Sequence, residues 1–267
     1  MLPHADDAIA RDGKILILAY DHGLEHGPVD FEPNPETADP EVIFDLGTHD
    51  AVTAVAVQKG IAEAYYPDYE DDVNLLLKMN GTSNLWMGEP DSPINCTPEY
   101  AKELGASAVG FTLYGGSNHE VEMAEEFREV QEGSRDLDMG VVMWSYPRGQ
   151  GVKNDTAADT IAYATRLGLE LGADVTKVKY PGSMEAMAEA VDVAGRSRVV
   201  MSGGSKTNDA AFLETVSAAM DAGADGLAVG RNVFQRENPT EILDALEAVV
   251  FEDASVEEAL TLTESTD

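Results

Sequence analysis

The stretch Leu171-Gly172-Ala173-Asp174-Val175-Thr176-Lys177-Val178-Lys179-Tyr180 contains the transition on which the predicted fold depends. A glycine at 172 ends a helical segment, and a short apolar run follows at once, as expected where a helix leads into a buried strand. Comparable transitions lie at 104–107 (Leu-Gly-Ala-Ser) and 222–225 (Ala-Gly-Ala-Asp). The repetition indicates one unit, a helix followed by a strand, that the chain uses several times.

Short apolar runs alternate with longer segments of helical period, a pattern typical of parallel strands joined by crossover helices. The predicted strands are 14–20, 51–57, 74–79, 107–113, 139–145, 173–179, 198–202 and 225–229. Eight strands match a closed (β/α)8 barrel, the TIM barrel of the α/β class. We therefore predict a single domain over residues 1–267, with the barrel core at about 14–250 and a frayed acidic tail at about 252–267.

Helix starts are predicted where a capping side chain precedes a proline at the first helical position. This arrangement occurs at Asp39-Pro40, Thr97-Pro98 and Asn238-Pro239. Two of the helices that follow should each bury one apolar face. These faces are formed by Phe212, Val216 and Ala219 and by Ile242, Leu246 and Val249.

The charge of the chain is strongly negative, with 50 Asp and Glu against 17 Lys and Arg, a net charge of −33 and a pI near 4.2. Such a chain repels itself unless salt screens the charges, and at molar salt the Debye length falls to about 3 Å. The hydrophobic content of 43% argues against disorder. We therefore predict a globular protein from a halophile, with neither nucleic acid nor an anionic membrane as its partner.

The cysteine content and the N-terminal sequence bear on the compartment. With Cys96 alone, the chain can form no internal disulfide and no thiolate metal site. The N-terminal sequence lacks the pattern of a secretory leader, and the longest early apolar run, Ile15–Tyr20, is too short to cross a bilayer. The expected location is the cytoplasm.

Lys177 and Lys179 are two of only eight lysines, and they lie two residues apart in a predicted strand. Side chains at that spacing point to the same face, where each amine raises the cost of protonating the other. This arrangement would produce a nucleophilic lysine. The alternative is a pair of surface or ion-paired lysines, and the spacing alone does not choose between the two residues.

The ends of the seventh and eighth predicted strands resemble a phosphate site. In a barrel of this kind the reacting groups follow the strands, and backbone N–H groups with a cation can hold a phosphate there. Ser202-Gly203-Gly204 and Gly230-Arg231 supply these groups, unless the glycines simply form turns. Arg148, after the fifth strand, would hold a second phosphate or pair with an acid.

The ends of the first and fifth predicted strands carry further candidates. Asp21 could act as a base, orient a substrate hydroxyl or cap the next loop. Tyr146 could transfer a proton if nearby cations such as Lys179 lower its pKa, or it could be a packed tyrosine with a satisfied hydroxyl. Trp144 is expected to form a wall of the pocket rather than to react.

The run His22-Gly23-Leu24-Glu25-His26 also matches the His-x-x-Glu-His pattern of inverted zinc hydrolases. That chemistry requires both histidines on one face of a helix. Glycine at 23 and 27 and proline at 28 oppose a helix, so the sequence favours an enzyme without a metal.

Together these motifs resemble those of a known family. The motifs are Tyr20-Asp21-His22-Gly23-Leu24-Glu25-His26-Gly27-Pro28, Trp144-Ser145-Tyr146-Pro147-Arg148-Gly149, Ala173-Asp174 with Lys177 and Tyr180, Ser202-Gly203-Gly204 and Gly230-Arg231-Asn232. In this order they resemble the archaeal-type class I fructose-bisphosphate aldolases of the DeoC-like aldolase family. The resemblance extends from about residue 14 to about residue 250.

The resemblance implies specific roles in the cleavage of fructose 1,6-bisphosphate to dihydroxyacetone phosphate and glyceraldehyde 3-phosphate. Lys177 would form the Schiff base, Tyr146 would donate and accept protons, and Asp21 would be an active-site carboxylate. The remaining substrate-binding residues would be His22, Trp144, Arg148, Ser202, Gly203, Gly204, Gly230 and Arg231. The resemblance also implies a homo-oligomer that needs no metal or other cofactor, and it makes Lys179 a neighbour that depresses the pKa of Lys177.

Three alternative functions remain open from the sequence. The first is 2-amino-3,7-dideoxy-D-threo-hept-6-ulosonate synthase, a transaldolase of aromatic amino-acid biosynthesis that shares the barrel and the lysine. The loop Glu25-His26 and the Trp144-Ser145 pair favour the aldolase. The others are the zinc hydrolase and a barrel that binds sugar phosphates without reacting with them.

The acidic excess generates a first prediction. Dialysis from concentrated potassium chloride into low salt should unfold or dissociate the protein, because the charge repulsion is no longer screened. Circular dichroism and size-exclusion chromatography before and after desalting measure the change. Identical spectra and elution volumes would show that the acidic surface is not an adaptation to salt.

Overall fold

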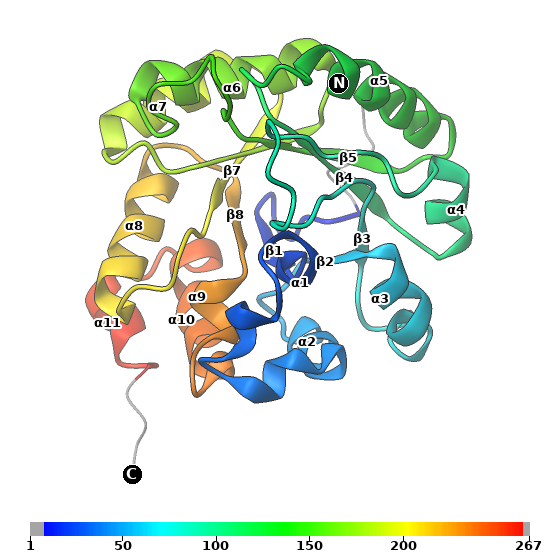
Figure 1. Ribbon diagram of the computed structural model, residues 1–267. Helices are drawn as coiled ribbons and strands as arrows, with labels where there is room; N and C mark the ends of the chain where they lie inside the picture. The colour runs from blue at the N-terminus through cyan, green and yellow to red at the C-terminus, as the bar shows by residue number, and fades with distance from the viewer. Residues whose placement is uncertain (1–7, 264–267) are drawn as a thin grey trace.

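A closed barrel of eight parallel strands forms the centre of the computed structural model, which describes residues 8–263 (Figure 1). Each strand pairs with the next along the chain, and the first pairs with the last. The strands are β1 (Ile15–Ala19), β2 (Ala54–Gln58), β3 (Leu75–Lys78), β4 (Ala108–Leu113), β5 (Gly140–Ser145), β6 (Val175–Val178), β7 (Arg198–Ser202) and β8 (Gly226–Val229). The predicted TIM barrel is confirmed, although β2 begins three residues later than expected.

Helices surround the barrel and cover the outer face of its strands (Figure 1). The α-helices are α1 (His22–Glu25), α2 (Pro40–Gly47), α3 (Lys59–Tyr65), α4 (Pro98–Glu103), α5 (Glu120–Asp136), α6 (Ala158–Leu171), α7 (Met184–Ala194), α8 (Asp209–Asp221), α9 (Arg231–Phe234), α10 (Pro239–Phe251) and α11 (Val256–Leu260). Three short 3-10 segments are η1 (Pro28–Phe31), η2 (Pro35–Ala38) and η3 (Tyr66–Asp68). Between residues 8 and 263, no helix has the length and apolar character that a membrane span requires.

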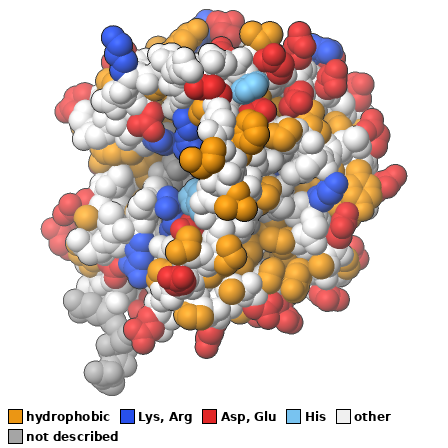
Figure 2. Space-filling model, in the orientation of Figure 1, with side chains coloured by type: hydrophobic (Ala, Val, Ile, Leu, Met, Phe, Trp, Pro, Cys, Tyr) orange, Lys and Arg blue, Asp and Glu red, His pale blue; other side chains and the backbone are white. Residues whose placement is uncertain are grey.

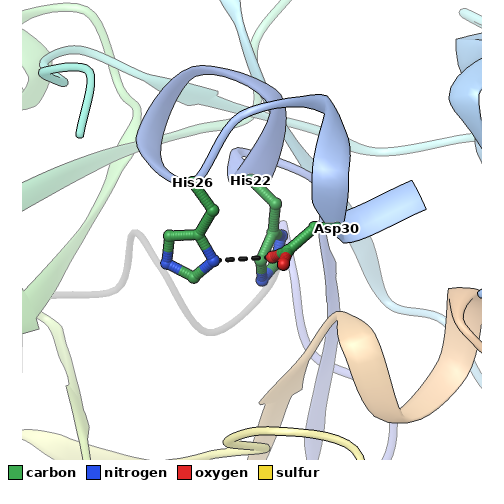
Figure 3. Close-up of side chains that lie close together, drawn as sticks. All are labelled: His22, His26 and Asp30. Carbon is green, nitrogen blue, oxygen red and sulfur yellow. Dashed lines mark hydrogen bonds and ion pairs between the residues drawn. The ribbon is translucent and has the colours of Figure 1, made fainter. Parts of the chain in front are cut away.

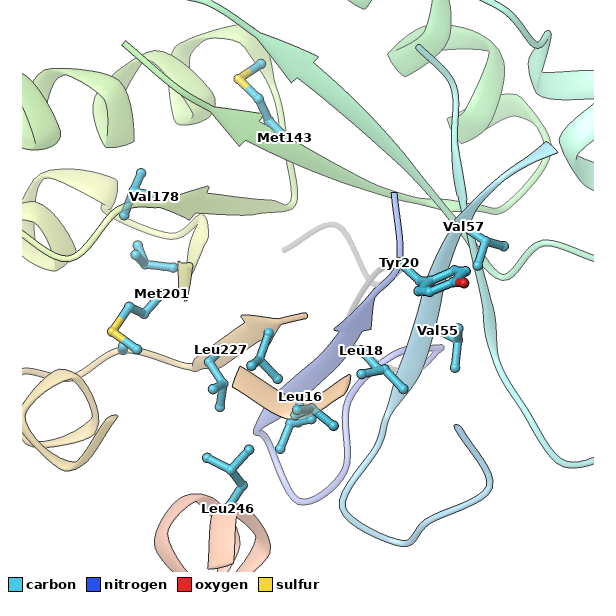
Figure 4. Packing of buried hydrophobic residues seen from close by; sticks show 14 of the residues in the cluster. Leu16, Leu18, Tyr20, Val55, Val57, Met143, Val178, Met201, Leu227 and Leu246 are labelled. Carbon is cyan, nitrogen blue, oxygen red and sulfur yellow. The ribbon is translucent and has the colours of Figure 1, made fainter. Parts of the chain in front are cut away.

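Alternation along the strands creates two separate hydrophobic clusters. In β1, Ile15 and Ile17 point into the barrel, whereas Leu16 and Leu18 pack outward against the helices. Figure 4 shows the outer cluster, in which Leu246 of α10 lies near the strands. The inner positions matter most for function, because the last inward side chain of each strand faces the mouth of the barrel.

The junctions between helix and strand have the predicted geometry. Gly105, Gly172 and Gly223 each adopt a positive φ, between 85° and 93°, which glycine tolerates without steric cost. Asp174 and Asp225, two residues after their glycines, use side-chain oxygens to accept N–H groups at the start of neighbouring strands. The repeated sequence therefore both ends a helix and fixes the register of the adjacent strand.

Two of the three predicted caps are present. The side chain of Asp39 accepts a hydrogen bond from the Glu41 N–H, and Thr97 accepts one from the Tyr100 N–H. Asn238 precedes α10 as predicted, but its side chain makes no capping bond and donates instead to the Glu241 carboxylate. The two predicted apolar helix faces of α8 and α10 are buried as expected.

The C-terminal segment differs from the expectation of a frayed tail. Residues 256–260 form α11, which packs against α8 and α10 and buries Ala259 completely. Its start is a capping box, in which Ser255 and Glu258 bond to each other's backbone N–H. The acidic composition of this segment concealed a short helix whose apolar residues, Val256, Ala259 and Leu260, pack against the core. Residues 264–267 of the predicted tail, like residues 1–7 of the predicted domain, lie outside the described residues.

Gly226 in β8 offers a test of barrel closure. It has a φ of +148°, and a Cβ atom there would lie 1.8 Å from the carbonyl oxygen of Ile15 in β1. Gly226→Ala should therefore lower the free energy of unfolding by about 3 kcal/mol. Gly60→Ala is the matched control, because that glycine is exposed in α3 with open space around it, and its effect should stay below about 1 kcal/mol.

Urea unfolding of both variants at one high salt concentration measures these changes. If the two variants unfold at the same denaturant concentration, close contact between β8 and β1 does not limit stability.

Candidate active site

A cavity of about 460 Å³ opens at the C-terminal ends of the strands. Figure 2 shows Asp and Glu side chains spread over the visible face, with Lys and Arg gathered around the central hollow. The cavity lining includes every residue that the sequence predicted for the site: Asp21, His22, Trp144, Tyr146, Arg148, Lys177, Ser202, Gly203, Gly204, Gly230 and Arg231. Barrel topology brings together residues from both ends of the chain.

Lys177 projects into the barrel from β6. It lies two residues after Val175, which belongs to the inner cluster, and it pairs in register with Trp144 of β5. Its side chain is buried, and Nζ lies 4.8 Å from the centroid of the Trp144 ring. Burial lowers the pKa of Lys177 to about 8; Asp21 opposes this change, and the ammonium of Lys78 reinforces it. The amine is therefore available as a nucleophile near neutral pH.

Lys179 does not have the role expected of it. β6 ends at Val178, and the ammonium of Lys179 forms an ion pair with Asp155 in the loop before α6. Both Lys177 and Lys179 lie near the ring of Tyr146, with Nζ 5.9 and 6.0 Å from its centroid. The cations that help burial to lower the pKa of Lys177 are Lys78 and Arg231.

Tyr146 and Trp144 lie on the same side of the cavity as Lys177. The Tyr146 hydroxyl lies 3.3 Å from Oγ of Ser202, within hydrogen-bonding distance. Burial raises the pKa of Tyr146 above its usual range, although the charge of Lys78 opposes this change. The phenol is therefore protonated at neutral pH and suited to donate a proton. Trp144 is almost completely buried and packs at the cavity wall, as predicted.

Asp21 is buried at the end of β1 and faces two lysines. Burial alone would raise the pKa of Asp21, but the charges of Lys78, His22 and Lys177 outweigh it and lower the pKa. Its side chain makes no capping hydrogen bond to α1, which removes the structural alternative considered for it. The carboxylate is thus ionised and close to the amine of Lys177.

Sequence reasoning missed Lys78 at the end of β3. Its side chain is completely buried, and its Nζ lies 3.1 Å from the Glu25 carboxylate and 3.6 Å from that of Asp21. The signal was present, because a lysine directly after three leucines lies at the end of a predicted strand. Such a position faces the barrel mouth, as Lys177 does.

The β7 and β8 ends bring together the residues that we predicted to hold a phosphate, with one change. The N–H of Gly203 donates to the Ala228 carbonyl and is not available to a ligand. Gly204 adopts a positive φ of 70°, and α9 begins at Arg231 with N–H groups that have no partner inside the helix. Asn232, which we had not assigned a role, donates to the carbonyls of Gly203 and Ser205 and fixes the loop.

Arg148 and Arg231 lie on different sides of Lys177. Arg148 follows β5, is exposed, and stacks over the Tyr114 ring at 5.0 Å. Arg231 begins α9, and its Nε lies 3.9 Å from Asp30. Two guanidinium groups on different walls of one cavity are suited to a substrate that carries an anion at each end.

His22, His26 and Asp30 lie together at one edge of the cavity, as Figure 3 shows. We predicted that this run would not be helical, but residues 22–25 form the single turn α1. The three side chains each offer a ligand atom, and these atoms lie within 4.8 Å of one another. Asp30 is already bonded to His26 at 2.6 Å.

Glu25 does not join this group, since its carboxylate binds Lys78. A zinc hydrolase would need the glutamate beside the metal as its base. Burial also lowers the pKa of His22 to about 4, so its imidazole is neutral at physiological pH. The histidine cluster could hold a cation, but it lacks the base that the hydrolase pattern requires.

Several known proteins are similar to this chain in sequence and in fold. A Halobacterium salinarum protein named fructose-bisphosphate aldolase class 1 is 72% identical over 260 residues, which cover 97% of this chain and 99% of that protein. A 2-amino-3,7-dideoxy-D-threo-hept-6-ulosonate synthase of Halobacterium salinarum is 34% identical, with 94% of this chain and 92% of that protein covered.

A solved archaeal fructose-1,6-bisphosphate aldolase, whose catalytic lysine is covalently bound to the carbinolamine intermediate of the substrate, superposes with a TM-score of 0.88. It is 48% identical, and the match covers 91% of this chain and 96% of that one. The sequence profile of the family described as DeoC/LacD family aldolase matches residues 15–236. The chain therefore belongs to the DeoC/LacD aldolase family.

Proposed function

We propose that this protein is a class I fructose-1,6-bisphosphate aldolase, a lyase that reversibly cleaves its substrate to dihydroxyacetone phosphate and glyceraldehyde 3-phosphate. The observation that carries the proposal is the buried amine of Lys177, with a lowered pKa, between an ionised carboxylate and a protonated phenol. The 72% identity to the Halobacterium salinarum aldolase supports the choice of substrate.

The reaction begins at Lys177. Its neutral amine attacks the C2 ketone, and loss of water gives an iminium ion. This cation withdraws electrons from the C3–C4 bond, so no metal is needed as an electron sink. Because Lys177 is buried beside Trp144, the iminium forms over an aromatic face that stabilises a cation.

Cleavage then requires two proton transfers. Loss of the C4 hydroxyl proton breaks the C3–C4 bond, releases glyceraldehyde 3-phosphate and leaves an enamine on Lys177. The ionised Asp21 would accept a proton, and the protonated Tyr146 would donate one to C3 of the enamine. Hydrolysis of the resulting iminium releases dihydroxyacetone phosphate and restores the free amine.

The phosphates orient the sugar in the cavity. The phosphate nearest the ketone would lie in the cradle of Ser202, Gly204, Gly230 and Arg231, with Gly203 shaping the turn. Arg148 would bind the second phosphate at the opposite wall. His22, whose ring lies where a Cβ on Gly230 would meet it, sets the width of the cradle.

We further propose that the chain acts as one catalytic domain in a cytoplasmic homo-oligomer and requires no metal or other cofactor. The reaction needs no metal because the iminium withdraws electrons from the C3–C4 bond, as a metal ion would in a metal-dependent aldolase. Activity that survives prolonged dialysis against a chelator at high salt is the expected result. Loss of activity that zinc restores would contradict it.

The second candidate is the heptulosonate synthase, favoured by one observation, the 34% identity to such a protein. Both reactions would begin with an imine at Lys177 and differ in the aldehyde acceptor. Assays of glyceraldehyde 3-phosphate against aspartate semialdehyde as acceptors distinguish them. A higher kcat/KM with aspartate semialdehyde would favour the synthase.

Borohydride trapping tests the covalent step. Wild-type protein incubated with fructose 1,6-bisphosphate and borohydride, with a chelator present, should gain a sugar-phosphate adduct on the peptide that contains Lys177. Lys177→Met should lose the adduct and at least about 10³-fold in kcat, because no other described amine lies buried within reach of the ketone without carboxylate partners. Intact mass and fragment mapping locate the adduct.

Lys179→Met is the matched control, since it removes the neighbouring amine and leaves Lys177 in place. This variant should still form the adduct. An adduct that maps to residue 179 in the wild type, or that persists in Lys177→Met, would exclude Lys177 as the nucleophile.

The lowered pKa of Lys177 predicts a specific pH dependence. Only the neutral amine attacks a ketone, so the rate of imine formation should rise about tenfold per pH unit at acidic pH and level off above about 8. An ordinary lysine would level off only near 10.5. Rapid-mixing trapping experiments between pH 6 and pH 10 measure this profile. A plateau that begins above pH 10 would mean that the pKa of Lys177 is unperturbed.

A further inference from the structure

The ammonium of Lys78 lies beside Asp21 and Glu25, two carboxylates that line the cavity, and has no part in the reaction steps above. Complete burial of a lysine is rare unless its charge is paired. Here Nζ donates to Oε1 of Glu25 at 3.1 Å and to Oγ1 of Thr112 at 2.7 Å, and Oδ2 of Asp21 lies 3.6 Å away. The group is thus a fixed positive charge between two carboxylates.

The surroundings of Lys78 hold it in one position. Thr112 of β4 is itself fixed by Asn80, whose side chain accepts the Thr112 N–H and donates to the Thr112 carbonyl, both at 2.8 Å. Asn80 and Thr112 are completely buried. The network therefore connects β3, β4 and α1 at the depth of the reactive amine, and Lys78 has little freedom to move.

Lys78 and Lys177 face the same aromatic ring. Their Nζ atoms lie 5.0 and 4.8 Å from the centroid of the Trp144 ring. Lys78 has two carboxylate neighbours, whereas Lys177 makes no hydrogen bond or ion pair with other residues in the range 8–263. When two amines share a pocket of low polarity, the one without a counter-ion loses its proton first.

We propose that Lys78 is a positioning residue of this site: its buried ammonium holds the carboxylates of Asp21 and Glu25 in place and, by its charge, favours the neutral form of the Lys177 amine. The inference rests on the proposed role of Lys177 as the imine-forming residue. It assigns the function of a second cation to a residue on β3, on the far side of β4 and β5 from Lys177.

The charged and titratable groups around Lys177 determine the direction in which its titration should move in each variant. They are Asp21 and His22 after β1, Glu25 of α1, Lys78 of β3, Tyr146 after β5, Lys179 after β6 and Arg231 of α9. Lys78→Met removes a positive charge from this set and leaves both carboxylates. The balance then favours the protonated form of Lys177, so its titration should move to higher pH.

Competitive acetylation measures this directly and needs no aldolase activity. Protein at high salt is treated with trace acetic anhydride at a series of pH values, and the modified Lys177 peptide is quantified by mass spectrometry. Half-reaction near pH 8 is expected for the wild type. Lys78→Met should shift it upward by about one pH unit and slow borohydride trapping at pH 7 about tenfold. Lys102→Met, which changes an exposed lysine on α4, should give the wild-type profile.

The double variant Lys78→Met/Glu25→Gln keeps the test decisive if the single variant folds poorly, because it removes both charges of the buried pair. It should shift the profile in the same direction, by no more than the single variant does. Circular dichroism confirms that each variant is folded. An unchanged half-reaction pH in folded variants would overturn the inference. A shift in protein that forms no adduct with fructose 1,6-bisphosphate would support the role of Lys78 and overturn the proposed aldolase function.

Discussion

Closure of the barrel through the pairing of β1 with β8 is the constraint on which the site depends. Once eight parallel strands form a ring, alternate side chains must point inward, and the last inward position of each strand faces one mouth. Asp21, Lys78, Trp144 and Lys177 meet there although they are far apart in the sequence. Gly226 marks the cost of closure, because only a residue without a side chain fits against the Ile15 backbone.

Burial inside the barrel explains why the pKa of one group in the cavity is lowered while that of another is raised. Burial disfavours the charged form of every titratable group, so it lowers the pKa of Lys177 and raises that of Tyr146. Asp21 stays ionised only because cations surround it. Above about pH 8, one low-polarity cavity thus holds a neutral amine, a protonated phenol and a carboxylate together, which are the states that imine chemistry needs.

The sequence predicted the parts of this arrangement that depend on local pattern. Short apolar runs located the strands, and glycines such as Gly172 located the junctions, because each reflects the conformation of a few neighbouring residues. Position at a strand end nominated Lys177 and Lys179 together, and the family resemblance chose Lys177. The sequence did not predict which residues would lie beside the charged groups. Asp155 beside Lys179 and the burial that raises the pKa of Tyr146 arise from segments brought together only by the fold.

A strongly acidic surface and a basic cavity are compatible because salt screens long-range charge interactions more than short-range ones. A chain with a net charge of −33 repels a bisphosphate, yet Arg148, Lys177, Lys179 and Arg231, four of its 17 basic residues, line the cavity. At molar salt, charges more than about 3 Å apart in solvent are screened, which suppresses repulsion from the surface. Buried pairs such as Lys78 with Glu25, 3.1 Å apart and shielded from solvent, are affected far less. High salt would thus weaken the long-range field that opposes substrate entry and leave intact the short-range contacts that prepare the amine.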